Sequence, residues 1–280
     1  MTTLLVGFDS AWTPENKGGL VAALCIDGGP PKELGRPQAV DFPTAREKIV
    51  DWQQEHQPAS TLVLIEQPTI VPNAKGQRPV ENIVSSIIGR RRSGMQPSNK
   101  SRADMFGDAA PIWPFLEYFG RVPKLHQSVC DTQVIETYPA LAITALGWTL
   151  ADSRDCGRLP KYNPAQTKKF AACDWNHVCN NTARALRDFG LTESPSWIDE
   201  LRNKVPLRKT DQDRLDACIC LLVAFHLFTR RSSLIVGDSE TGYIVFPDDP
   251  RLVSELHVRC RKTNQPEMRW ARPYQAKSRV

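Results

Sequence analysis

The strongest constraint on the fold is the segment 211–228, which is apolar on almost every side in its second half. That half contains Ala217, Ile219, Leu221, Leu222, Val223 and Phe225. A helix that is apolar all round is stable only when it is buried. We therefore expect this helix to be packed on both sides, against a sheet or another helix.

Apolar runs that end in turn residues predict five strands. Residues 4–9 and 20–26 predict two strands joined by a turn, and residues 39–42 predict a third, shorter strand. Residues 61–66 are almost wholly apolar, which is typical of a central strand covered on both faces. Residues 131–136 predict the fifth strand.

Helical patterns alternate with these strands and complete an α/β arrangement with a mixed sheet. The expected helices span residues 44–56, 80–88, 111–119, 175–189 and 197–202, and a hairpin is expected at 233–246. We interpret residues 1–250 as one domain with insertions at about 69–131 and 147–209. Residues 251–280 are expected to form a basic C-terminal tail.

The net charge of +5 is distributed unevenly. Residues 89–103 carry five cations and no acid, and residues 259–280 carry seven cations and one acid. The rest of the chain is therefore acidic, at about −6. Clustered Lys and Arg displace the counterions of phosphates, so nucleic acid is an expected partner. Two solvated basic segments without a partner are the alternative.

The composition argues against a secreted or membrane protein. The N-terminus lacks a basic segment before an apolar one, and no apolar run is long enough to cross a bilayer. The eight cysteines show no paired framework, so most are expected to be free thiols. We expect a cytoplasmic protein without a membrane partner.

Four acids stand where predicted elements end or converge. Asp9 ends the first strand and Glu66 ends the fourth. Asp213 and Asp216 lie three residues apart, so one face of the long helix presents both. Ligand sites gather at strand ends in α/β sheets. The four carboxylates therefore predict one shared site.

Each acid also has a structural explanation. Asp9 fits the start of a turn, and Glu66 fits a solvent-exposed acid at a strand end. Asp213 follows Thr210 at the spacing of a helix capping box. Asp216 fits a purely structural role less well, because it lies one turn deeper and core residues follow it directly.

Carboxylates placed together repel one another unless cations neutralise them. Sites rich in oxygen suit Mg²⁺ or Mn²⁺. Two such ions hold the attacking and leaving oxygens of a phosphoryl transfer without a nucleophilic side chain. We therefore expect Asp9, Glu66, Asp213 and Asp216 to bind metal and to catalyse phosphodiester cleavage.

The motifs FDSAW, LIEQP and DRLDACIC resemble those of ribonuclease H-like nucleases, and the last resembles the D-x-x-D-A helix of Holliday-junction resolvases. A closer resemblance is to the DUF429 family of predicted ribonuclease H-like nucleases. It rests on residues 9–12, 65–68, 89–91, 136–139, 213–217 and 240–247. The resemblance implies a ribonuclease H-like mixed five-stranded sheet, with three antiparallel strands followed by parallel ones.

The resemblance adds Glu136 to the candidate catalytic residues, with no assigned role. Arg90 and Arg91 lie in the basic loop between the fourth and fifth strands, where guanidinium groups would bind phosphate. Trp12 stands beside Asp9 and is a candidate for stacking on a base, although core packing is its alternative.

Three functional hypotheses follow. The first is a metal-dependent nuclease. The second is a nucleic-acid-binding protein whose ribonuclease H-like site is degenerate. The third is a nucleotide-handling enzyme related to ATPases and sugar kinases, although the segment after Phe8 lacks the glycine of a phosphate loop.

Overall fold

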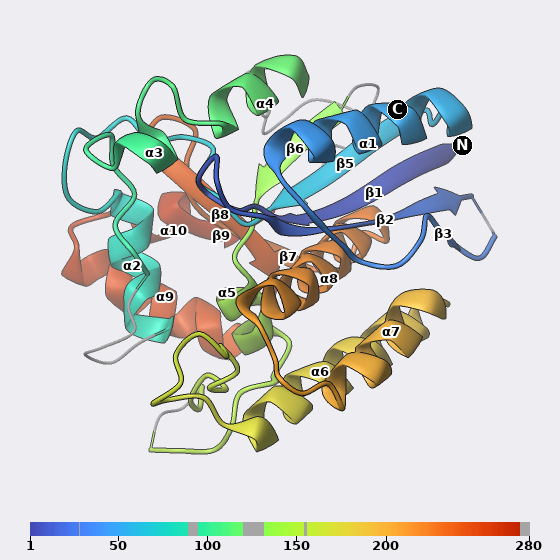
Figure 1. Cartoon of the computed structure of the whole chain (residues 1–280). Coiled ribbons are helices and arrows are strands. Elements are labelled where there is room, and N and C mark those ends of the chain that lie inside the picture. Colours follow the sequence, from blue (N-terminus) through green and yellow to red (C-terminus); the bar gives the residue numbers. More distant parts are fainter. Residues whose placement is uncertain (28, 89–94, 120–131, 154–155, 275–280) are drawn as a thin grey trace.

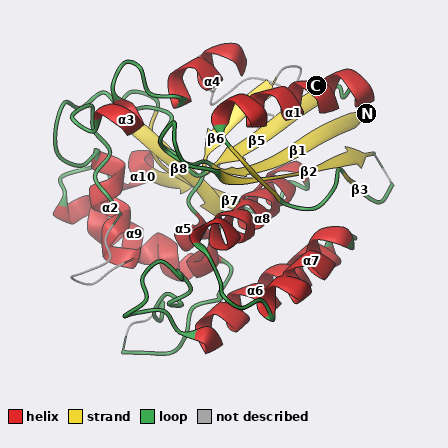
Figure 2. Ribbon diagram, viewed as in Figure 1, coloured by secondary structure: helices red, strands yellow, loops and turns green. Residues whose placement is uncertain are grey.

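The computed structural model describes residues 1–27, 29–88, 95–119, 132–153 and 156–274. Helices lie on both sides of a central sheet, and a smaller sheet lies beside it (Figures 1 and 2). In the described ranges, no helix combines the length and the hydropathy needed to cross a bilayer.

The central sheet is mixed. Its order is β3 (Lys32–Glu33), β2 (Gly18–Ile26), β1 (Thr2–Asp9), β5 (Ser60–Ile65) and β6 (Thr132–Glu136), and β4 (Gln38–Val40) also pairs with β2. The pairs of β2 with β1, β3 and β4 are antiparallel, whereas β1, β5 and β6 are parallel. The mixed sheet is thus confirmed.

The number of strands differs from the expectation. The sheet has six strands rather than five within the described residues. The chain between β2 and α1 (Phe42–His56) pairs with β2 twice, first through β3 and then through β4. Gly35 and Pro37 separate these two short strands, so the apolar pattern predicted only the second of them.

One face of the sheet is covered by α1 and α4 (Ile112–Phe119). The even-numbered side chains of β1 point to this face, because alternate residues of a strand face opposite ways. Leu4, Val6 and Phe8 accordingly pack in one cluster with Phe42 and Phe115. Phe8 contacts both rings at centroid distances of 5.3 and 5.5 Å.

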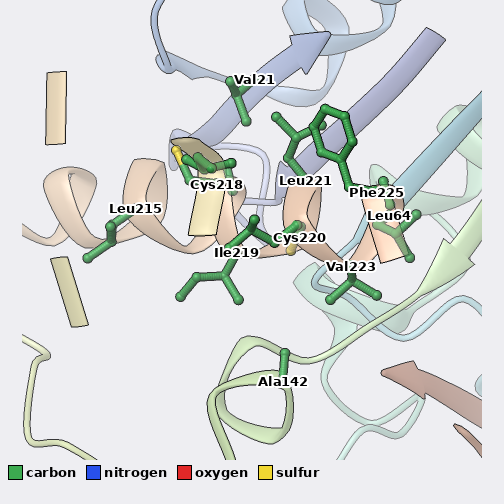
Figure 3. Packing of buried hydrophobic residues seen from close by; sticks show 14 of the residues in the cluster. Val21, Leu64, Ala142, Leu215, Cys218, Ile219, Cys220, Leu221, Val223 and Phe225 are labelled. Atoms are coloured by element: carbon green, nitrogen blue, oxygen red, sulfur yellow. The ribbon is translucent and has the colours of Figure 1, made fainter. Parts of the chain in front are cut away.

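The other face is covered by α8 (Lys209–Phe228), with α6 (Ala172–Asp188) and α7 (Glu193–Arg202) beyond it. Figure 3 shows Val21 and Leu64 on the sheet side of α8 and Ala142 of α5 (Pro139–Ala145) on its other side. The expectation that this helix is buried on both sides is confirmed.

Two glycines let α8 lie directly on the strands. A Cβ atom at Gly7 would stand 2.1 Å from the carbonyl oxygen of Ala217. A Cβ atom at Gly19 would stand 2.3 Å from the carbonyl oxygen of Asp213. Both distances are far below van der Waals contact, so only glycine allows this approach of helix and strand backbones.

The smaller sheet is antiparallel, in the order β8 (Gly242–Pro247), β7 (Ser233–Asp238) and β9 (Ala271–Pro273). It packs in a separate apolar cluster with α2 (Pro79–Ile88), α9 (Pro250–Lys262) and α10 (Glu267–Trp270). The segment expected to be a basic tail therefore contains two helices and a strand in its described part, because Leu252, Leu256 and Cys260 give it a buried face.

We predict that Gly7→Ala lowers the free energy of unfolding by about 3 kcal/mol or more, the cost of overpacking a core. The new methyl group meets the backbone of α8, which cannot turn aside as a side chain can. The matched control is Gly29→Ala, because its nearest neighbour would lie 3.8 Å away. Urea unfolding followed by circular dichroism measures both; equal midpoints for the two variants would contradict the close contact.

Candidate functional site

Asp9 and Glu66 lie at the carboxyl ends of adjacent parallel strands. Asp9 is the last residue of β1, and Glu66 follows β5 directly. The Glu66 backbone N–H donates to the carbonyl oxygen of Phe8 at 2.9 Å, so the hydrogen bonding between β1 and β5 extends to Glu66. By alternation Asp9 shares its face with Leu5, and Glu66 shares its face with Leu64. Both leucines pack against α8, so both acids belong to its side of the sheet.

Asp213 and Asp216 reach the same place from α8. The backbone of Asp213 touches Gly19, which is the register partner of Asp9 on β2. The close contact at this glycine therefore brings the first turns of α8 to the end of β1. We call Asp9, Glu66, Asp213 and Asp216 the acid cluster. The charges of Glu66, Asp213 and Asp216 all act on the buried carboxyl group of Asp9, so the four predicted residues lie close together.

Burial makes the acid cluster electrostatically costly. Desolvation raises the pKa of Asp9 well above its ordinary value, and the charges of Glu66, Asp213 and Asp216 raise it further. Burial likewise raises the pKa of Glu66 to about 8 and that of Asp216 to about 7. The pKa of Asp213 is also raised, chiefly by desolvation. At neutral pH the cluster therefore retains protons unless cations join it.

Neighbouring side chains hold two of the acids in place. The Trp12 indole N–H donates to the Glu66 carboxylate at 2.8 Å and to its backbone carbonyl at 2.9 Å. The Tyr162 hydroxyl donates to Asp216 Oδ1 at 2.9 Å, and the Gln212 amide donates to Asp216 Oδ2 at 2.8 Å. These donors orient the carboxylates, and each of them lowers the pKa of the acid that it contacts.

Within the part of the chain that the structure describes, a lysine lies against the acid cluster. Lys209 is the first residue of α8, and its ammonium group forms an ion pair with Asp213 one turn later. Desolvation lowers the pKa of Lys209, but the charges of Asp9, Asp213 and Asp216 outweigh it and raise that pKa above the ordinary value. Lys209 therefore remains protonated and offsets part of the negative charge.

The described residues contain no group of three or more His, Cys, Asp or Glu side chains already arranged to hold a metal ion. The described contacts of the cluster are instead with other side chains. Lys209 pairs with Asp213, Trp12 binds Glu66, and Tyr162 and Gln212 bind Asp216. The metal site predicted from the sequence stays a prediction.

Asp213 does not cap the helix. The acid at the capping position is Asp211, whose carboxylate accepts from the Arg208 backbone N–H at 2.9 Å and pairs with Lys204 at 2.8 Å. The helix begins at Lys209, two residues earlier than expected. This shift moves Asp213 beyond the first turn and leaves its carboxylate for the acid cluster.

Glu136 lies apart from the acid cluster. It is in register with Ile65 at the end of β6, one residue before the level of Glu66. Its carboxylate accepts from the Arg78 guanidinium at 2.6 and 3.0 Å and from the Thr69 backbone N–H at 3.0 Å. Arg78 also pairs with Glu81 at 2.8 Å. Glu136 thus ties a buried arginine to the sheet.

The remaining predicted residues have different outcomes. Arg90 and Arg91 lie outside the described residues. Trp12 is partly buried, with its backbone in the left-handed region at φ 63°, and its ring meets Phe106 edge-on at 5.6 Å. Its indole holds Glu66, and stacking on a base stays a prediction.

A family model described as "Protein of unknown function (DUF429)" matches residues 7–241, most of the 280-residue chain. The chain belongs to the DUF429 family. No curated protein and no solved structure matches it. The matched range contains the whole acid cluster and Glu136.

Sequence reasoning missed three site residues of this DUF429 protein. Lys209 and Gln212 stand four residues before Asp213 and Asp216, so the helical spacing carried a signal for both. Tyr162 comes from an irregular part of the segment between α5 and α6, and nothing in its local sequence links it to Asp216.

The raised carboxyl pKa values predict a pH dependence of stability. The unfolded chain ionises near its ordinary carboxyl pKa of about 4, whereas folded Asp216 and Glu66 keep protons to about 7 and 8. The folded state binds more protons between these values. In EDTA, the free energy of unfolding therefore falls as pH rises through this window and levels off above it.

Asp216→Asn removes one of these groups and should make the fall shallower. Urea titrations at successive pH values measure this, with Asp188→Asn, an exposed aspartate of α6, as the control. A wild-type curve that does not fall across the window would mean that the cluster takes up no extra protons.

The Arg78 network predicts a second stability effect. Arg78→Met leaves Glu81 and Glu136 buried without their cation, and breaking such a pair costs about 3–5 kcal/mol. The control is Arg36→Met, which removes a solvent-exposed pair with Glu200 and should leave the stability almost unchanged. Thermal unfolding compares them; similar losses would contradict a structural role for the network.

Proposed function

We propose that this DUF429 protein is a divalent-metal-dependent nuclease with a ribonuclease H-like fold, which hydrolyses phosphodiester bonds of nucleic acid at the acid cluster. The arrangement of the central sheet supports the fold, because the strands around β2 are antiparallel and β1, β5 and β6 are parallel. This is the order that the resemblance of its motifs implies.

The observation that carries the proposal is the meeting of four acids from three separate elements. Asp9 and Glu66 end neighbouring strands, and Asp213 and Asp216 face them from α8. Such a group of buried acids is unfavourable for stability alone, as the pKa values of Glu66 and Asp216 indicate, which are raised chiefly by desolvation and further by neighbouring acids. A binding or catalytic role explains why the fold contains it.

The donor set fits Mg²⁺ or Mn²⁺, which prefer oxygen ligands. One lysine offsets only part of the charge of the acid cluster. The buried amide oxygen of Gln212 also has no hydrogen-bond partner in the described structure, although the amide nitrogen of the same side chain contacts Asp216. An unsatisfied oxygen beside buried carboxylates suits a cation or its water.

Asp9, Glu66 and Asp216 would hold the metal, with Asp213 as a further ligand or the anchor of a bound water. The metal would activate water and stabilise the leaving oxygen of the phosphodiester. Trp12 orients Glu66, and Tyr162 and Gln212 orient Asp216, so these ligands are positioned before the substrate arrives.

Nucleic acid as the partner is supported by the basic segments. The described part of the C-terminal one exposes Arg261, Lys262 and Arg269. A cytoplasmic location is part of the same proposal and agrees with the seven described cysteines, which are all free thiols.

Labelled single-stranded, duplex, hybrid and branched substrates test the proposal, each incubated with Mg²⁺, Mn²⁺ or EDTA. We expect cleavage only with metal, and a loss of about a hundredfold or more in Asp9→Asn and Asp216→Asn, which remove ligand charge. Asp188→Asn serves as the control.

The alternatives predict other results. Binding that persists in EDTA without cleavage on any substrate favours a nucleic-acid-binding protein with a degenerate site. ATP turnover without cleavage favours a nucleotide-handling enzyme. Full cleavage by Asp216→Asn would remove the acid cluster from the mechanism.

A further inference from the structure

Lys209 occupies an unusual position for a cation. It is the first residue of α8, where the partial positive charge of the helix N-terminus repels an ammonium group. Its ion pair with Asp213 also has the less favourable order, with the cation before the acid. The helix alone therefore does not hold the lysine there. The acid cluster does, since the charge of Lys209 acts on all four carboxyl groups.

The lysine side chain is also partly accessible to solvent. Its side chain is 48% exposed, whereas that of Asp213 is 10% exposed. Lys209 is therefore the more exposed partner of this ion pair, and the acid is the buried one. Rotation of the side chain into water would break the ion pair with Asp213 and restore the hydration of the ammonium group.

A second feature indicates that the lysine does not complete the site. Gln212 is 8% exposed, and its amide oxygen has no partner among the described residues. The nitrogen of the same amide donates to Asp216, so this oxygen lies beside the cluster as an unused acceptor. Lys209 thus leaves both negative charge and a buried oxygen for another cation to satisfy.

We propose that Lys209 is an internal counter-cation that covers the acid cluster until a divalent cation displaces it. The inference rests on the proposed function, because it takes the cluster as the metal site. Metal binding then replaces the single positive charge of Lys209 by the two charges of a divalent cation. The released ammonium group moves to the solvent side, where a polyanionic substrate approaches. Lys209 is a positioning residue in this scheme and not a metal ligand.

Isothermal titration with Mn²⁺ alone tests the proposal on the full chain, with Lys209→Gln compared with wild type at low salt. Lys204→Gln is the matched control. Lys204 is 42% exposed and pairs with Asp211, an aspartate of α8 that does not belong to the acid cluster. We expect Lys209→Gln to bind Mn²⁺ on the order of tenfold more tightly, since one competing charge is gone. Lys204→Gln should change the affinity less than about twofold.

Metal-free stability provides the second measurement. Without its counter-cation the acid cluster repels itself, so Lys209→Gln in EDTA should unfold about 3 °C below wild type. Saturating Mn²⁺ should remove this difference. A lysine that only supports the fold would instead lose stability and metal affinity together.

The outcomes separate the two proposals. Equal or weaker Mn²⁺ binding by Lys209→Gln overturns the displacement and leaves the nuclease proposal standing. Absence of Mn²⁺ binding in wild type and both variants overturns the displacement and the metal-dependent nuclease together. Tighter binding by Lys209→Gln without cleavage by wild type supports the displacement and counts against the nuclease.

Discussion

The contact between the backbone of α8 and the backbones of β1 and β2 determines where the acid cluster forms. At Gly7 and Gly19 no side chain separates helix from strand, so their main chains meet directly. Aspartate side chains are short, and a helix held farther away by ordinary side chains would not bring Asp213 to Asp9. The same contact buries the apolar part of α8, so the packing of the core and the geometry of the site have one origin.

The protein treats its buried acids in two ways. Glu136 and Glu81 share Arg78, whose guanidinium is fully buried and has no route to solvent. Among the described residues, the partners of the acid cluster are a half-exposed lysine and a set of neutral donors. In the Arg78 network each charge has a fixed ion-pair partner, which is typical of a structural role. The acid cluster buries several acids without a fixed cation for each, and this difference is the reason for our proposal that the cluster binds a ligand.

Much of this arrangement was predictable from the sequence. Parallel strands place Asp9 and Glu66 at one edge of the sheet, and the helical period places Asp213 and Asp216 on one face of α8. Local patterns were therefore sufficient to predict that these acids share a site. Local patterns did not reveal the partner of Glu136 or the contact of Tyr162, because both join segments far apart in the chain. They also missed β3, whose two residues are too few to show alternation.

The family match ends at residue 241, inside the turn between β7 and β8. Both strands that pair with β7 therefore lie beyond it, one directly after the turn and the other at residues 271–273. The match of the family model therefore ends inside the smaller sheet. A chain trimmed to the matched range would leave β7 with two open edges and the apolar side of α2 uncovered, which is a surface prone to self-association.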